Sequence, residues 1–165
     1  MTSNNIPDPQ RFITASDESG ESYFSNAEAI SLSAAGTLGS AKTRLAYTSD
    51  GQISEGMLKG GHDLQRYQAE LSGDAPLVRS DGGTNVWVID TPPASKSPLH
   101  STASLDYVIQ VSGTIELSMS NGDTRTLYPG DIAIQRGTLH VWSNPSTTEW
   151  SRLVGVMTGM GEQRG

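Results

Sequence analysis

The sequence predicts an all-β domain, and three observations support this fold class. From Thr84 onward, short runs rich in Val, Ile, Leu, Thr and Trp recur at spacings typical of antiparallel strands. Residues that favour turns, mainly Gly, Asn, Asp and Ser, separate these runs. One segment alone has helical periodicity. A chain of 165 residues is long enough for a single domain with one good-sized hydrophobic core.

The first half of the chain predicts an arm, a strand and a helix. Residues 11–16 and 21–25 alternate like short strands around Asp17-Glu18-Ser19-Gly20, which predicts a hairpin. Residues 25–40 are rich in Ser, Ala and Gly and predict no element, whereas residues 43–48 predict a strand. Apolar residues at helical spacing predict one short helix at residues 63–71, with Asp63 capping its first turn.

The second half predicts a barrel or sandwich. Its runs lie at residues 84–90, 105–111, 114–119, 124–127, 131–135, 140–143 and 149–157. The Asn121-Gly122 pair predicts a tight hairpin in which both residues have positive φ. We expect an N-terminal arm, hairpin and helix at residues 1–83, a barrel at 84–158 and a flexible tail at 159–165.

Composition excludes several functions. The formal net charge of −7 argues against nucleic acid as a partner, because binding to phosphates needs clustered Lys and Arg. With no cysteine, the chain has no disulfides and no thiolate ligands, which fits a reducing compartment. The N-terminus lacks the apolar stretch of a signal peptide, and no long apolar run follows. We expect a cytoplasmic protein without membrane contact.

Two motifs carry the chemistry. The first runs from His100 to Asp106 and is followed by Gly113. The second runs from Gly130-Asp131 to His140 and is followed by Asn144. Together they resemble the paired motifs of the cupin superfamily, in which His-x-His precedes Glu and Gly, and Gly-Asp precedes a turn, His and Asn.

This resemblance covers residues 84–157 and implies a double-stranded β-helix, or jelly-roll barrel. It places His100 and His140 at the histidine positions and Asp106 at the Glu position. Thr102 departs from the pattern, because metal-binding cupins usually have their second histidine there.

Strand parity groups the candidate site residues in one cavity. Residues separated by even numbers share a face of an unbroken strand. The predicted catalytic residues are His100, His140 and Asp106, and the predicted substrate-binding residues are Arg136, Thr102, Trp142 and Thr138. Arg136 either binds a carboxylate, enolate or phenolate, or is a solvated charge at the edge of the barrel. Trp87 and Trp150 are expected in the core, and His62 outside the site.

Three functions fit these residues. The first is metal-independent acid–base chemistry on a small carbonyl or phenolic compound, namely dehydration, decarboxylation, isomerisation or cyclisation. The second is an oxidoreductase that holds Fe, Zn, Mn or Ni with His100, Asp106 and His140; Thr102 and the short Asp106 weaken this ligand set. The third is a binding protein without catalysis.

The sequence around both motifs is similar to that of small fungal cupins that accompany polyketide biosynthesis. This resemblance implies a tailoring enzyme of specialised metabolism. We therefore favour a lyase or isomerase that uses no cofactor. A homodimer is expected, because the early strands could cover the edge of a partner's sheet.

Overall fold

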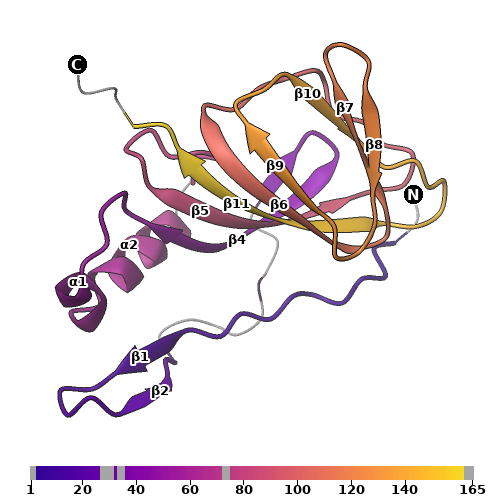
Figure 1. The fold of residues 1–165 in the computed structure, drawn as a ribbon. Helices are drawn as coiled ribbons and strands as arrows, with labels where there is room; N and C mark the ends of the chain where they lie inside the picture. Colours follow the sequence, from indigo (N-terminus) through magenta and orange to yellow (C-terminus); the bar gives the residue numbers. More distant parts are fainter. Residues whose placement is uncertain (1–2, 27–31, 33–35, 72–74, 162–165) are drawn as a thin grey trace.

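The computed structural model describes residues 3–26, 32, 36–71 and 75–161. Two sheets face each other, and two helices pack beside them, as Figure 1 shows. The larger sheet has six strands in the order β3-β4-β5-β11-β6-β9, and the smaller has three in the order β10-β7-β8. The prediction of a mostly-β jelly roll is confirmed.

Most strands lie close to their predicted positions, but a short strand at Gly36–Leu38 falls in the stretch for which we predicted no element. The larger sheet contains β3 (Gly36–Leu38), β4 (Ala41–Ser49), β5 (Thr84–Thr91), β6 (Ser104–Ser112), β9 (Ile132–Arg136) and β11 (Ser151–Gly159). The smaller sheet contains β7 (Ile115–Met119), β8 (Thr124–Leu127) and β10 (His140–Ser143). Every pairing is antiparallel. Because β3 and β4 extend the larger sheet, this sheet begins well before residue 84, where we placed the barrel boundary.

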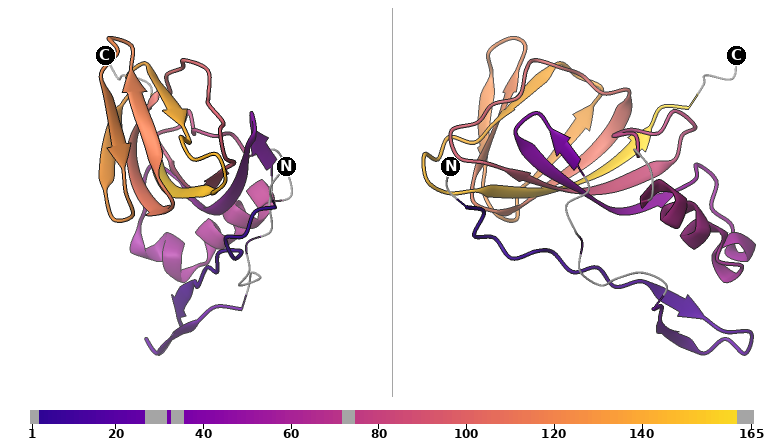
Figure 2. Two further views of the ribbon diagram at one scale, coloured as in Figure 1. Left: turned by 90° about the vertical axis from the view of Figure 1, so that its right-hand side faces the viewer. Right: turned by 180° about the vertical axis from the view of Figure 1, so that it is seen from behind.

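The N-terminal hairpin is confirmed, with β1 (Thr14–Ser16) paired to β2 (Ser22–Phe24). All three views in Figures 1 and 2 show it below the two facing sheets, at the end of an extended arm. Half of the low-complexity stretch, residues 27–31 and 33–35, lies outside the described residues, as do residues 162–165 of the predicted tail.

Two helices occur in the described residues, where we predicted one. The expected helix is α2 (His62–Leu71), and the additional α1 (Glu55–Lys59) is capped by Ser54, whose side chain accepts a hydrogen bond from the Met57 amide. Five residues with an internal glycine are too few to show a helical period, so the sequence does not reveal α1. No helix in the described ranges is long and apolar enough to cross a membrane.

The turn between β7 and β8 differs from the prediction. Gly122 has a φ of 92°, but Asn121 does not have positive φ. The Met119 amide donates to the Asp123 carbonyl, and the Gly122 amide donates to the Met119 carbonyl. Ser120, Asn121 and Gly122 therefore form the turn between Met119 and Asp123, and only the glycine needs the left-handed conformation.

Two clusters of apolar side chains divide the inner face of the larger sheet. Under α2, Tyr67 packs with Leu45, Trp87 and Met157. Under the smaller sheet, the buried cluster consists of Val108, Ile115, Leu127 and Leu153. Ile89 packs against both clusters. The space between the clusters is where the two sheets leave a cavity.

The outer face of the larger sheet carries a buried ionic cluster. Asp90 is fully buried and accepts hydrogen bonds from Arg152 at 2.6 and 2.7 Å and from Arg44 at 2.8 Å. Asn4 of the N-terminal arm donates to the same carboxylate, and Asp8 accepts from Arg44 at 2.6 Å. These contacts hold the arm against the sheet that forms the cavity wall.

Candidate active site

A cavity of about 350 Å³ lies between the two sheets. Most of its wall is apolar and comes from both core clusters and from the turn between β3 and β4. The apolar lining residues are Leu38, Ala41, Leu77, Ile89, Val108, Ile115, Trp142, Leu153 and Met157. The polar residues predicted for the site that line it are His100, Thr102, Asp106 and His140. A small polar group set in an apolar wall is typical of a pocket that binds a small organic molecule.

The two histidines face each other across an isolated β-bridge. The His100 amide donates to the His140 carbonyl at 3.0 Å, and the His140 amide donates back at 2.9 Å. Their ring centroids are 4.3 Å apart. The Nδ1 atom of His100 lies 2.9 Å from the Pro98 carbonyl, and that of His140 lies 2.8 Å from the Thr138 carbonyl. Because a carbonyl only accepts, each Nδ1 carries a proton, and in a neutral ring the lone pair is then on Nε2.

Burial keeps His140 neutral. The side chain is 3% exposed, and this burial lowers its pKa below the usual 6.5. The nearby imidazole of His100 lowers the pKa further, whereas the contact with the Thr138 carbonyl and the charge of Asp106 act in the opposite direction. At neutral pH, His140 is therefore an uncharged base.

Asp106 is shifted toward its acid form. It is 3% exposed, and burial raises the pKa of its carboxyl above the usual 3.8. The Thr102 hydroxyl donates to its Oδ2 at 3.1 Å and, with Ser104, partly offsets this rise. Its Oδ1 has no hydrogen-bond partner within the described structure. Environment thus moves the pKa values of an acid and a base in opposite directions within one cavity.

The structure does not place Arg136 and Thr138 in the cavity, so parity was wrong here. Gly137 has a φ of 63°, which interrupts the chain between β9 and β10 and breaks the alternation of faces. In β9, Gln135 pairs with Asp106 and is buried, whereas Arg136 pairs with Leu105 and is exposed. Thr138 is exposed as well, and its hydroxyl donates to Gln135. Trp142 lines the cavity as predicted.

The sequence analysis missed Gln135 and Ser104. Ser104 has the same parity as His100, Thr102 and Asp106, so the rule that grouped those residues could have found it. The sequence did not indicate Gln135, because the apolar Ile132 and Ile134 suggest that their own face of the strand is buried. In the structure these two residues face outward, at 62% and 50% exposure, and Gln135 faces inward. Only the pairing of β9 with β6 reveals that Gln135 faces inward.

The donor set does not fit the predicted three-ligand metal site. Within residues 3–26, 32, 36–71 and 75–161, no group of three or more His, Cys, Asp or Glu side chains is arranged to hold a metal ion. The two Nε2 lone pairs suit a metal. Thr102, however, occupies the usual position of a histidine ligand, and its hydroxyl holds Asp106.

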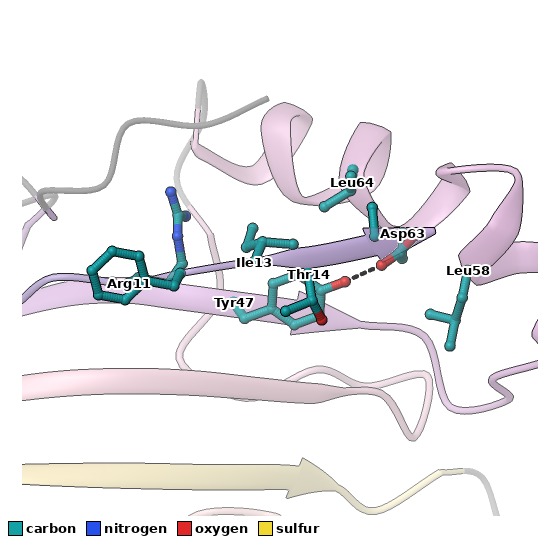
Figure 3. A pocket seen from close by; sticks show the side chains of 9 residues that line it. Arg11, Ile13, Thr14, Tyr47, Leu58, Asp63 and Leu64 are labelled. Carbon is teal, nitrogen blue, oxygen red and sulfur yellow. Dashed lines mark hydrogen bonds between the residues drawn. The ribbon is translucent and has the colours of Figure 1, made fainter. Parts of the chain in front are cut away.

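A second pocket of about 370 Å³ lies between the hairpin arm, β4 and the two helices (Figure 3). The Tyr47 hydroxyl donates to Asp63, so Asp63 anchors α2 to β4 and lies within the helix, where we predicted a cap. Burial raises the Tyr47 pKa, and the bond to Asp63 adds to this effect. The residues lining this pocket include no histidine and are not shared with the cavity between the sheets.

A jelly roll whose facing sheets enclose two histidines and an acid is the architecture of a cupin. Sequence relatives agree. A cupin-domain-containing oxidoreductase of Neurospora crassa is 30% identical over 149 residues, which cover 90% of this chain and 72% of that protein. The chain belongs to the cupin superfamily.

Other relatives come from biosynthesis clusters. A phomopsin biosynthesis cluster protein of Diaporthe leptostromiformis is 37% identical over 90% of this chain and 77% of its own length. An oryzines biosynthesis cluster protein of Aspergillus oryzae is 30% identical over 93% of this chain and 84% of its own length.

No protein-family profile matches the sequence. Among solved structures, a polyketide cyclase of Streptomyces resistomycificus aligns with a TM-score of 0.48 and 14% identity, over 73% of this chain and 66% of that chain. A cupin barrel protein of Salinispora arenicola aligns with a TM-score of 0.41 and 22% identity, over 46% and 62% of the two chains.

Proposed function

We propose that this cupin is an enzyme of specialised, polyketide-like metabolism that performs acid–base chemistry on a small carbonyl compound. The observation that carries this proposal is that two histidines and Asp106 line one largely apolar cavity, where burial lowers the pKa of His140 and raises that of Asp106. Efficient proton transfer needs a neutral base and an available acid at the same pH. Relatives from two biosynthesis clusters support the metabolic context.

The neutral His140 accepts a proton at Nε2 from the carbon next to the substrate's carbonyl. Its Nδ1–H stays bound to the Thr138 carbonyl, which fixes the ring and stabilises the imidazolium that forms. His100 has the same tautomer and is the second candidate base. Asp106 is the candidate acid of this site, and the Thr102 hydroxyl holds one of its two oxygens.

The apolar wall selects the body of the substrate. An aromatic or polyketide-like skeleton would bury its surface against the apolar residues of both core clusters. Trp142 lies edge-on to His140, at 5.9 Å between ring centroids, and would contact an aromatic ring. Lys96 lines the cavity, so an acidic substituent would meet Lys96 and not the outward-facing Arg136.

The experiment is hydrogen–deuterium exchange of benzylacetone in deuterium oxide, followed by NMR. Wild-type protein should exchange the protons next to the carbonyl, and His140→Ala or His100→Ala should slow this exchange about 100-fold or more. His62→Ala is the control, because His62 is exposed and does not line the cavity. If the wild-type protein exchanges these protons no faster than buffer, the proposed function fails.

An oxidoreductase is the second candidate, because several relatives are named cupin-domain-containing oxidoreductases. The paired Nε2 atoms of His100 and His140 are the feature of this site that would suit it. Turnover that stops under a chelator or without oxygen, and returns with added metal, would favour this function over acid–base chemistry.

A further inference from the structure

Three buried polar atoms next to the cavity have no hydrogen-bond partner in the described structure. They are Oγ of Ser104, Oδ1 of Asp106 and Nε2 of Gln135. Their residues are 0%, 3% and 3% exposed. Ser104 lies two residues before Asp106 in β6, and Gln135 is the direct partner of Asp106 in β9. Residues in this relation point to the same face of a sheet, here the face that lines the cavity.

The other polar atoms of two of these side chains are engaged. The Thr102 hydroxyl donates to Oδ2 of Asp106 at 3.1 Å, and the Thr138 hydroxyl donates to Oε1 of Gln135 at 2.7 Å. These bonds fix both side chains. Ser104 lies near enough to Asp106 to lower its pKa in part, yet no hydrogen bond of regular geometry joins the two. The three atoms therefore belong to side chains that are neighbours on one face of the sheet, and none of the three satisfies another.

Such an arrangement needs another polar group to hydrogen-bond with these three atoms. Nearly all buried polar groups in proteins have a partner, and leaving one unsatisfied destabilises the folded state. The Gln135 amide donates, the Ser104 hydroxyl donates or accepts, and Oδ1 of Asp106 accepts in the carboxylate or donates in the carboxylic acid. One oxygen with two lone pairs and a hydrogen can satisfy all three, as a buried water with about three partners does.

We propose that Ser104, Asp106 and Gln135 bind one hydroxyl oxygen, which belongs to water in the free protein and to the substrate's leaving group during turnover. Resting on the proposed acid–base function, this inference selects one of its reactions. The reaction is the elimination of water from a β-hydroxycarbonyl compound.

The step balances without any co-reactant. The histidine Nε2 takes the proton from the carbon next to the carbonyl, and the electrons of that C–H bond form the new C=C bond. The bond between the β-carbon and its oxygen breaks, and the oxygen keeps the electron pair and takes the proton of Asp106. Water is released, with Ser104 and Gln135 as its remaining partners. The imidazolium then returns the proton to the Asp106 carboxylate, which restores both groups.

A high-resolution crystal structure of the unliganded protein tests the oxygen site directly. We expect an ordered water within hydrogen-bond distance of Ser104 Oγ, Asp106 Oδ1 and Gln135 Nε2. If those three atoms instead bond to one another and leave no room for an oxygen, the inference is overturned.

Turnover of two related probes tests the assigned reaction. Benzylacetone reports proton removal alone, and its β-hydroxy derivative reports elimination to the conjugated benzylideneacetone. Wild-type protein should act on both. Ser104→Ala and Gln135→Leu should each slow elimination about tenfold to a hundredfold while leaving deuterium exchange of benzylacetone nearly unchanged. Ser118→Ala, whose hydroxyl contacts Thr124 on β8, is the control.

The outcomes separate the two proposals. Exchange by the wild-type protein without elimination overturns the hydroxyl site and leaves the acid–base function standing. Variants that lose neither activity, or that lose both together as a folding defect would cause, also overturn it. Absence of exchange in the wild-type protein contradicts the proposed function itself.

Discussion

Replacing Asp106 by Asn should lower activity while relieving a cost to stability. The carboxyl is buried and its pKa is raised by that burial, so the charged form is disfavoured in the folded state. Between pH 3.8 and the higher folded-state pKa, the folded chain binds more protons than the unfolded chain. The free energy of unfolding therefore falls as the pH rises through this window.

The structure sets the size of each effect. An amide oxygen at position 106 can still accept the Thr102 hydrogen bond, which contributes about 0.5–1.5 kcal/mol. Asp106→Asn therefore removes the acid and leaves this contact, whereas Asp106→Ala would also orphan the Thr102 hydroxyl. Loss of a general acid should slow turnover about 100-fold to 10,000-fold.

Two measurements on the same preparations check this prediction. Elimination of the β-hydroxy derivative of benzylacetone gives the activity, and denaturant titrations over a range of pH give the free energy of unfolding. Relative to wild type, the variant should gain stability as the pH rises above 3.8. A variant that keeps full activity, or whose relative stability falls over this range, would refute the assignment of Asp106 as a buried acid.

Three further predictions concern stability and assembly. Asp90→Ala should lower the free energy of unfolding by about 3–5 kcal/mol, because it leaves the buried guanidinium groups of Arg44 and Arg152 without their carboxylate partner. In the same denaturant titration, replacing the exposed Asp123 by Ala should change the free energy of unfolding little. Because the pKa of His140 is lowered from 6.5, stability should fall as the pH drops below that value, and His140→Gln should flatten this pH dependence. Light scattering should show a homodimer, since β1 and β2 form an isolated hairpin, marginal on its own; a monomer would contradict this.

Local patterns predict the strands of the second half well because residues that favour turns bound each run. Alternation locates β5, β6 and β7 within one or two residues, and β8 and β10 at their observed bounds. Patterns of this kind cannot show that β4 joins the edge of β5, because strand pairing depends on contacts far apart in the sequence. They also miss α1, whose stability depends on a Ser54 cap and on packing beside α2.

The sequence predicts the site residues that lie in a continuous strand or motif, and it does not predict those that lie beyond an interruption of the strand. His100, Thr102, Asp106, His140 and Trp142 all line the cavity. The prediction for Arg136 was wrong because we extended the alternation of strand faces across Gly137, whose positive φ interrupts it. Gln135 could be assigned to the inner face only from the register of β9 against β6.

Thr102 connects the two halves of the proposal. A histidine at this position would add a third nitrogen ligand, whereas threonine offers a hydroxyl that donates to Oδ2 of Asp106. That bond holds the carboxyl and leaves its Oδ1 without a partner, on the sheet face that Asp106 shares with Ser104 and Gln135. The same departure from the cupin motif that weakens a metal site therefore orients a buried acid. Replacing Thr102 by Val should accordingly impair elimination more than proton exchange, because the base is untouched while the acid loses its orientation.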